Sequence, residues 1–363
     1  MNAERRIRAL LEAAKVEING PNPWDPQIHN RDFFSRVRAR GSVGLGETYM
    51  DHWWDCERLD EFFNRVVGAR LSEQIPITPN LLWLLFKSRI QNRQRKGLAR
   101  TAAEVHYNID VDIFEATFDR RLNGSCGHWK DAQTLDSAQE AKLDLICHKA
   151  QLQRGQRVLD IGSGWGAFSG FAAERFGVEC VGVSVSSVQV EYCRKRYAHL
   201  PVEFRLNDYR DISIDVDRIV SIEMFEHVGP KNHGTYFGCA RRCISKDGVF
   251  LLQTILANEP SPVLDPWLDK YIFPHAVLPT LGEIAIAAQG LFVIQDFHTF
   301  GADYDKTLMA WYQNFQSRRP MIAKKYGDRF CRMWDYYLLC CAGGFRSRII
   351  NVGQLVLLPD RPH

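Results

Sequence analysis

The sequence lacks the marks of several common protein classes. No apolar run reaches the ~18 residues that a membrane-spanning helix needs, and the start, Met1 to Arg6, predicts a charged amphipathic helix instead of a signal peptide. The ten cysteines are scattered and form no C-x-x-C pair. We therefore expect a cytoplasmic protein with reduced cysteines and no metal site. The net charge of +3 alone does not indicate a class of binding partner. We expect no nucleic acid partner.

The chain is long enough for more than one folded part. Its 363 residues suggest two domains, and we find no repeat of fixed period and no low-complexity tract. We expect a first domain over residues 1–86, a basic linker over 87–104 and a larger domain over 105–363. Within the first domain the pattern predicts a strand at Lys15–Asn19 and a helix near Asp60–Val67.

Two features of the N-terminal part leave alternatives open. The paired Trp53 and Trp54 belong either to a core, which is the commoner case, or to a patch that faces lipid or a second copy. The connector is basic and follows the apolar segment Leu81–Phe86. It is either a solvated linker or a landing site for anionic lipid headgroups. Its basic residues are Lys87, Arg89, Arg93, Arg95, Lys96 and Arg100.

From about residue 101 onward, short apolar segments alternate with helical patterns. This alternation predicts an α/β fold with a doubly wound sheet, whose ligands bind at the carboxyl ends of the strands. The candidate strands are 157–161, 179–184, 202–206, 218–222, 248–254, 292–298 and, as the last, 353–358.

A glycine-rich loop follows the first of these strands. The segment Val158–Gly166 begins as an apolar strand that contains Asp160 and ends in the glycine pattern G-x-G-x-G. The segment that follows, Ala167–Phe176, predicts a helix. The loop lacks the Gly-Lys-Ser/Thr of a phosphate loop and the G-x-G-x-x-G of a dinucleotide site. The spacing, with Asp160 before it and Ser184 at the end of the next strand, favours S-adenosylmethionine. An ordinary glycine turn is the alternative.

Other candidates for chemistry lie near strand ends and loops. Glu226 and His227 follow the 218–222 strand and could bind, orient or move a proton, or simply begin a helix. Cys126 and Cys341 are, taken singly, more typical of buried small side chains than of nucleophiles. Tyr304 follows a turn that could hold its hydroxyl in a pocket. The aromatic-rich C-terminal third suits a long apolar ligand, although a packed core is the simpler explanation.

Together these motifs resemble the bacterial cyclopropane-fatty-acyl-phospholipid synthases, over nearly the whole chain. The stretches that carry the resemblance are Val16–Gly20, Gly44–Asp51, Trp53–Glu57, His106–Tyr107, Ser125–Cys126, the glycine loop, Phe225–Asn232, Asp265–Trp267, Lys270–Pro274, Phe300–Asp305 and Cys341–Gly343.

The resemblance implies a Rossmann-like class I methyltransferase domain with a smaller N-terminal α+β domain for lipid binding or dimerisation. It implies methylene transfer from S-adenosylmethionine to a cis double bond in the acyl chains of membrane phospholipids, on the anionic inner face of the membrane, by a peripheral homodimer. The cofactor would lie against Ser125, Gly162, Gly164, Ser184, Gln189, Asp208, Tyr209 and Arg210.

The resemblance also implies how the proton leaves. A bound bicarbonate would accept it, held by Cys126, Glu226, the backbone of Ile255, Tyr304 and a histidine, with Cys341 lining the pocket. This chain departs from the family at the histidine, because the usual His-Thr-Ile-Gly is here Gln253-Thr254-Ile255-Leu256. Gln253 can donate to an anion but cannot share a proton.

Three hypotheses follow from this departure. The first is cyclopropane formation with bicarbonate. The second is a methyltransferase of the same fold that makes methyl-branched or methylene lipids because Gln253 replaces the histidine. The third is a relative that binds lipid and cofactor but has lost catalysis.

Overall fold

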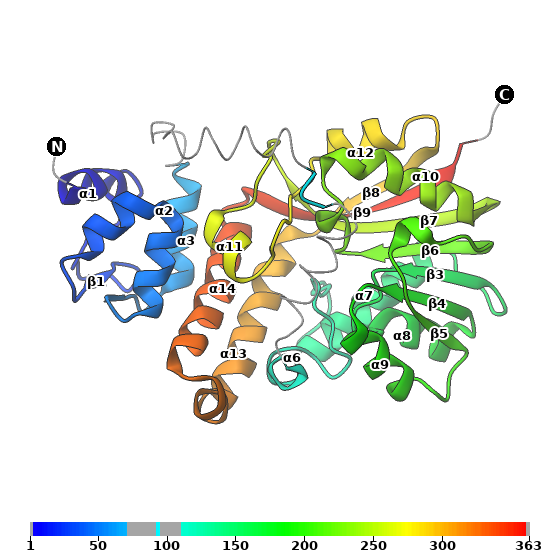
Figure 1. The fold of residues 1–363 in the computed structure, drawn as a ribbon, viewed down its shortest axis with the longest axis horizontal. Helices are drawn as coiled ribbons and strands as arrows, with labels where there is room; N and C mark the ends of the chain where they lie inside the picture. Colours follow the sequence, from blue (N-terminus) through cyan, green and yellow to red (C-terminus); the bar gives the residue numbers. More distant parts are fainter. Residues whose placement is uncertain (1–2, 71–91, 95–109, 361–363) are drawn as a thin grey trace. The chain divides into compact units, whose positions relative to one another are not determined.

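Two compact units make up the computed structural model, which describes residues 3–70, 92–94 and 110–360 (Figure 1). The first, here called the helical unit, takes its described residues from Met1–Lys87, Leu264–Pro274 and Tyr304–Ile350. The second, the sheet unit, takes them from Ser88–Val263, His275–Asp303 and Asn351–His363. Each unit therefore draws on three separate segments of the chain, whereas the sequence analysis divided the chain only at the linker.

The sheet unit is built on a seven-stranded sheet among the described residues, in the order β5-β4-β3-β6-β7-β9-β8. The pairs β3–β4, β4–β5, β3–β6 and β6–β7 are parallel, and β8–β9 is antiparallel. The strands are β3 Arg157–Ile161, β4 Glu179–Ser184, β5 Val202–Leu206, β6 Val216–Ile222, β7 Ile244–Ala257, β8 Phe292–Thr299 and β9 Ile350–Pro359. The predicted α/β fold with a doubly wound sheet is confirmed.

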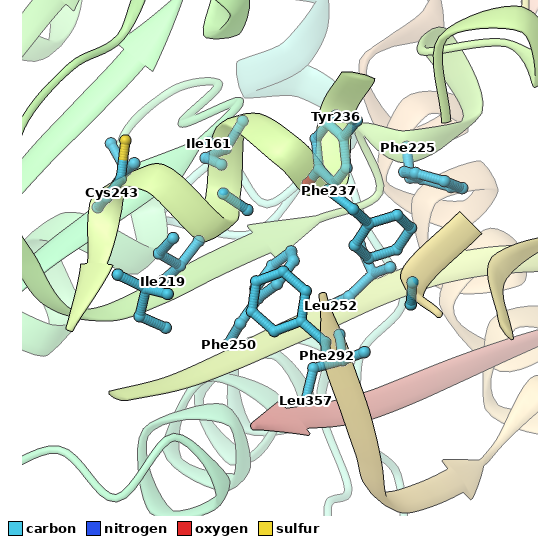
Figure 2. Close-up of a cluster of buried hydrophobic side chains, with 14 of the residues drawn as sticks. Ile161, Ile219, Phe225, Tyr236, Phe237, Cys243, Phe250, Leu252, Phe292 and Leu357 are labelled. Atoms are coloured by element: carbon cyan, nitrogen blue, oxygen red, sulfur yellow. The ribbon is translucent and has the colours of Figure 1, made fainter. Parts of the chain in front are cut away.

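Helices cover both faces of this sheet, which is why its central strands read as nearly continuous apolar runs. The helices of the unit are α6 Val111–Thr117, α7 Leu135–Lys149, α8 Ala167–Phe176, α9 Ser187–Arg196, α10 His233–Cys243 and α12 Leu281–Ala288. Alternate residues of β7 point to opposite faces: Phe250 and Leu252 pack with α10 and α12, while Val249 and Leu251 pack with α7 and α8. Figure 2 shows the first of these layers.

The helical unit contains α1 Ala3–Ala13, α2 Phe33–Met50, α3 Leu59–Gly68, α11 Pro266–Tyr271, most of α13 Gly301–Tyr326, and α14 Asp328–Arg346. A two-stranded sheet pairs β1 Gln27–Ile28 with β2 Trp54–Asp55. The helix α2 is kinked at Gly41, whose φ of 58° and ψ of −133° are not helical. None of the described helices is long and apolar enough to cross a membrane.

The core of the helical unit decides between the two interpretations of the paired tryptophans. Trp54 is fully buried and packs against Tyr49 and Phe62. From α14, Arg332 donates to the carbonyl oxygens of Tyr49 and Trp54 at 2.6 and 3.0 Å. Trp54 is therefore a core residue. Trp53 is half-buried under the guanidinium of Arg36, 4.9 Å from the ring centroid.

One predicted element of this unit is wrong. Lys15–Asn19 is not a strand, because Lys15 and Asn19 adopt φ values of 55° and 59°, which break an extended chain. The helix expected near Asp60–Val67 is confirmed as α3. The apolar segment Leu81–Phe86 lies outside the described residues, as does the basic connector apart from residues 92–94.

Candidate functional site

The glycine loop lies between β3 and α8, at the carboxyl ends of the parallel strands. Gly162 and Gly164 have φ values of 87° and 51°, a region where glycine is favoured. The N–H groups of Gly162 and Ser163 both donate to the carbonyl of Val183 at 3.0 Å, which ties the loop to β4. The loop therefore stands beside β6, where the strand order reverses and such sheets bind ligands.

The two loop glycines meet different surroundings. A Cβ atom on Gly162 would lie 2.5 Å from Cγ of Met224. A Cβ atom on Gly164 would meet no described atom within 4 Å. Gly162 is thus required by packing, and Gly164 borders open space on the side where a ligand could approach.

At the end of the second strand, Ser184 and Gln189 are joined by a hydrogen bond. The hydroxyl of Ser184 donates to Oε1 of Gln189 at 2.9 Å and accepts from the N–H of Ser186 at 3.1 Å. Both side chains are buried. The amide of Gln189 is therefore held in one orientation.

The segment after β5 forms a closed group of its own. Both carboxylate oxygens of Asp208 accept hydrogen bonds from the Arg210 guanidinium at 2.7 Å, and Arg210 also donates to the carbonyl of Gln94. The guanidinium is thus engaged within the protein. The hydroxyl of Tyr209 is buried and has no hydrogen-bond partner among the described residues, as is true of the Ser163 hydroxyl in the glycine loop.

Asp160 lies beneath the loop instead of in it. Its side chain points to the face of the sheet that α7 and α8 cover, where Ser169 donates to Oδ2 at 2.7 Å. Burial raises the pKa of Asp160 to about 7, against the hydrogen bond from Ser169 and the charge of Lys142. The structure therefore gives Asp160 contacts that support the loop from below.

A buried lysine that the sequence analysis missed stands behind Ser125. Lys142 of α7 has no exposed surface, and its Nζ donates to Ser125 Oγ and Asn123 Oδ1, each at 2.8 Å. Burial lowers its pKa to about 8, and the nearby charges of Glu223 and Asp119 oppose this shift. Because Nζ occupies an acceptor position of Ser125, the hydroxyl hydrogen is left to be donated elsewhere.

A turn after β6 carries two carboxylates, of which the sequence analysis noted only Glu226. Phe225 anchors the turn: it is fully buried, and its ring centroid lies 5.0 Å from Tyr236 and 5.6 Å from Phe237 (Figure 2). Glu226 directly follows Phe225 in the chain, and Glu223 precedes Phe225 by two residues. The backbone of Glu223 has a φ of 49°. No sequence signal marked Glu223, because a left-handed backbone at a strand end depends on its neighbours in space.

Glu223 joins two of the predicted site residues. Its Oε1 accepts from the backbone N–H of Cys126 at 3.0 Å and from Nε2 of Gln253 at 2.8 Å. On β9, Gln354 donates from Nε2 to Oε1 of Gln253 at 3.0 Å. This contact fixes the orientation of the Gln253 amide, since Oε1 is the acceptor and Nε2 is left to donate to Glu223.

Glu226 is paired with the end of β7. Its Oε1 accepts from the N–H of Ile255 at 2.5 Å. Its Oε2 is buried and has no hydrogen-bond partner within the part of the chain that the structure describes. Burial, followed by the charge of Glu223, raises the pKa of Glu226 to about 8, so this carboxyl is protonated at neutral pH.

The structure thus brings Cys126, Gln253, Ile255 and Glu226 together around Glu223 at the carboxyl ends of β6 and β7. It places Tyr304 and Cys341 in the helical unit. Tyr304 is buried and stacks on Phe345 at 4.3 Å. Cys341, on α14, is partly exposed.

The donor sets differ in how well they suit the two implied ligands. The open side of Gly164 fits a nucleoside cofactor, as do the hydroxyls of Ser163 and Tyr209, which have no hydrogen-bond partner within the described ranges. Bicarbonate fits poorly, because the donors implied for it already serve carboxylates: the N–H of Cys126 and the Gln253 amide bond Glu223, and Ile255 bonds Glu226. An anion there would also stand beside the charge of Glu223.

The contrast between the two glycines gives a testable prediction. Gly162→Ala is expected to lower the free energy of unfolding by roughly 2–4 kcal/mol, because left-handed strain adds to overpacking. Gly164→Ala should cost only about 1 kcal/mol of strain but should weaken S-adenosylmethionine binding at least about tenfold. Urea unfolding and calorimetric titration measure the two effects, and equal losses of stability in both variants would contradict the packing argument.

Comparisons with known proteins agree with this geometry. The family model described as mycolic acid cyclopropane synthetase matches residues 94–355. The chain is 46% identical over 355 residues to the cyclopropane-fatty-acyl-phospholipid synthase of Escherichia coli (strain K12), covering 98% of this chain and 93% of that protein. It is 32% identical over 361 residues to the tuberculostearic acid methyltransferase UfaA1 of Mycobacterium tuberculosis, covering 92% of this chain and 83% of that protein.

A solved structure shows the same relationship in three dimensions. The mycolic acid cyclopropane synthase CmaA1, solved in complex with SAH and CTAB, superposes with a TM-score of 0.67 at 30% identity, covering 72% of this chain and 98% of that one. With its sheet, its glycine loop and these similarities, the chain belongs to the mycolic acid cyclopropane synthetase family and is an S-adenosylmethionine-dependent methyltransferase.

Proposed function

We propose that this enzyme adds a methylene group, derived from S-adenosylmethionine, across the cis double bond of unsaturated acyl chains in membrane phospholipids, and so forms cyclopropane fatty acids. The observation that carries the proposal is the similarity to the E. coli cyclopropane-fatty-acyl-phospholipid synthase, which extends over 98% of the chain. It therefore includes the N-terminal residues that precede the region matched by the family model.

The cofactor would supply an electrophilic methyl group, and the residues of the chain would orient it. We assign its binding to Ser125, Gly162, Gly164, Ser184, Gln189, Tyr209 and the pair Asp208–Arg210, with Asp160 supporting the loop. Ser125 is prepared to donate, because Lys142 occupies its acceptor position. The fixed amide of Gln189 and the buried hydroxyl of Tyr209 are further polar groups for a nucleoside.

The remaining assignments concern the acyl chain and the proton. We assign Cys126, Glu226, Gln253 and Ile255 to the place where the proton leaves, and Tyr304 and Cys341 to the lining of the lipid site. Bicarbonate as the proton acceptor stays a prediction of the resemblance, and the donors implied for it already bond Glu223 and Glu226. We also propose that the enzyme works as a homodimer at the anionic inner face of the membrane, with the helical unit and the basic connector contacting lipid.

The test is the chemical structure of the product. Purified protein is incubated with S-adenosylmethionine and vesicles of a monounsaturated phospholipid that contain anionic lipid, and vesicles of a saturated phospholipid serve as the control. The unsaturated chains should gain the mass of one CH2 group, and proton NMR should show ring methylene protons. Unchanged lipid from folded protein that binds the cofactor would contradict the proposal and favour a relative without catalysis.

The same spectra decide the second hypothesis from the sequence. Vinylic methylene or branched methyl signals in place of ring protons would show that the substitution at Gln253 changes the outcome of the reaction. In that case Gln253→His should shift the product toward the ring.

A further inference from the structure

Glu223 is a carboxylate in an unusual backbone position at the carboxyl end of β6. Its φ of 49° lies in the left-handed region, which costs a non-glycine residue about 1 kcal/mol or more. Its side chain is only partly exposed. A strained backbone that holds an acid at the ligand edge of a parallel sheet suggests a function for that acid.

The hydrogen bonds around Glu223 hold one oxygen in place. Oε1 accepts from the Cys126 backbone and from Gln253, whose amide is itself held by Gln354. Donors from two separate parts of the chain thus converge on one carboxylate oxygen, and Gln354 from a third part holds one of these donors in place. Two donated hydrogen bonds stabilise the ionised form and reduce its strength as a nucleophile, while leaving it able to accept a proton.

The charges nearby also favour an ionised Glu223 beside a protonated Glu226. Lys142 is the buried cation of the region, and Glu223 is the first of the charges that raise its pKa. Two neighbouring carboxyl groups do not both ionise readily. Glu226 has a pKa raised to about 8 by burial and by the charge of Glu223, and its buried Oε2 has no partner among the described residues. Of the two carboxyl groups, Glu223 is therefore placed as the base and Glu226 as the acid.

We propose that the carboxylate of Glu223 is the proton acceptor of the reaction, built into the chain at the donors that the family resemblance assigns to bicarbonate. The inference rests on the proposed function. Methyl transfer to the alkene leaves a cation on the neighbouring carbon of the acyl chain. Ring closure then breaks one C–H bond of the new methyl group: its electron pair forms the second ring bond to the cationic carbon, and its proton passes to Glu223.

Three proteins test the proposal under CO2-free conditions: the wild type, Glu223→Gln and Glu223→Gly. The wild type should turn over at a rate that changes less than about twofold when bicarbonate is added. Glu223→Gln should lose at least about 100-fold, the lower range for a lost acid–base group, and bicarbonate should not restore it because the amide fills the site. Glu223→Gly suits the left-handed backbone and opens the donors, so its activity should return with added bicarbonate.

A binding measurement that does not depend on turnover accompanies these rates. Carbon-13 NMR with labelled bicarbonate should detect binding to Glu223→Gly and not to the wild type. Glu203→Gln, at an exposed carboxylate of β5 that pairs with Arg205, is the matched control and should behave as the wild type in both assays. Thermal unfolding of each variant identifies any that fails to fold.

The outcomes separate this inference from the function on which it rests. A wild type that requires bicarbonate and binds it, or a Glu223→Gln variant with full activity, would overturn the role of Glu223 while leaving ring formation intact. Absence of lipid product from every folded variant, with cofactor bound, would overturn the proposed function. In that case bicarbonate binding to the wild type would still refute the inference, and binding only to Glu223→Gly would support it.

Discussion

Replacing Lys142 by methionine is expected to lower turnover by about 10- to 100-fold. The ammonium group donates a charge-assisted hydrogen bond to Ser125 Oγ, and such a bond contributes roughly 1.5–3 kcal/mol. If this free energy serves to orient Ser125 toward the cofactor and to keep Glu223 ionised, losing the hydrogen bond lowers the turnover rate by the corresponding factor. Steady-state kinetics and cofactor titration measure the effect.

The stability of the Lys142→Met variant should depend on pH in a defined direction. The pKa of Lys142 is lowered to about 8 in the folded protein, mainly by burial. Between pH 8 and about 10.5 the unfolded chain binds a proton that the folded one does not, so wild-type stability gains from Lys142 as the pH rises. Below pH 8 Lys142 is charged in the folded protein, and the cost of burying this charge lowers the free energy of unfolding in full. Methionine removes both this cost and the dependence of stability on pH between pH 8 and about 10.5.

Two comparisons make the Lys142 prediction decisive. Lys149 lies about two turns further along α7 and pairs with Asp296 at 3.1 Å, so Lys149→Met should leave turnover unchanged. Urea unfolding of both variants at about pH 7 and pH 9.5 tests the linkage. The ionisable groups whose charges act on Lys142 are Glu223, Asp119, Cys126 and Asp160. A Lys142→Met enzyme with wild-type activity would show that the lysine serves packing alone.

The sheet was predictable because its signals are local. The strands 157–161, 179–184 and 202–206 agree with β3, β4 and β5 to the residue. Buried parallel strands are short apolar runs bounded by turns, and the glycine loop that follows β3 is a contiguous motif. Prediction was poorer for β7, which runs from Ile244 to Ala257 through polar residues such as Lys246 that carry no apolar pattern.

The site residues were predictable only where a residue stands in a recognisable sequence motif. Gln253 was visible as a departure from a motif, but its partner Gln354 lies on another strand and is joined to it only by the fold. Glu223 depends on a backbone conformation that the sequence does not display. Lys142 did leave a signal: it lies among Ala138, Ile146 and other buried residues of α7 at helical spacing, which places a lysine on the apolar face.

The helical unit shows the same limit in its long-range contacts. Glu47 of α2 is buried and receives a hydrogen bond from Lys270 at 2.7 Å and another from Tyr271 at 2.9 Å. Likewise, Arg346 of α14 bonds Asp60 and Asp305. Because these partners are far apart in sequence, a division of the chain at the linker could not anticipate that α11 and α14 join the N-terminal helices in one unit.

Glu226→Gln is expected to make the protein more stable in alkaline solution. In the folded protein the pKa of Glu226 is raised from 4.5 to about 8, by burial and by the charge of Glu223. Between these values the folded state holds a proton that the unfolded state has released, so wild-type stability falls as the pH rises. The amide removes this pH dependence, and the gain in the free energy of unfolding should be on the order of 4 kcal/mol at pH 8 and small below pH 5.

The same substitution should change activity little, within about tenfold, if Glu226 works as a neutral acid. The amide oxygen can accept from Ile255 as Oε1 does, and its N–H group can take the place of the acid proton on Oε2. Glu223→Gln, by contrast, removes the proposed base. Chemical unfolding from about pH 5 to 8, together with turnover of both variants, distinguishes the two carboxyl groups. A loss of more than about 100-fold in Glu226→Gln, with Glu223→Gln active, would exchange their roles and make Glu226 the base.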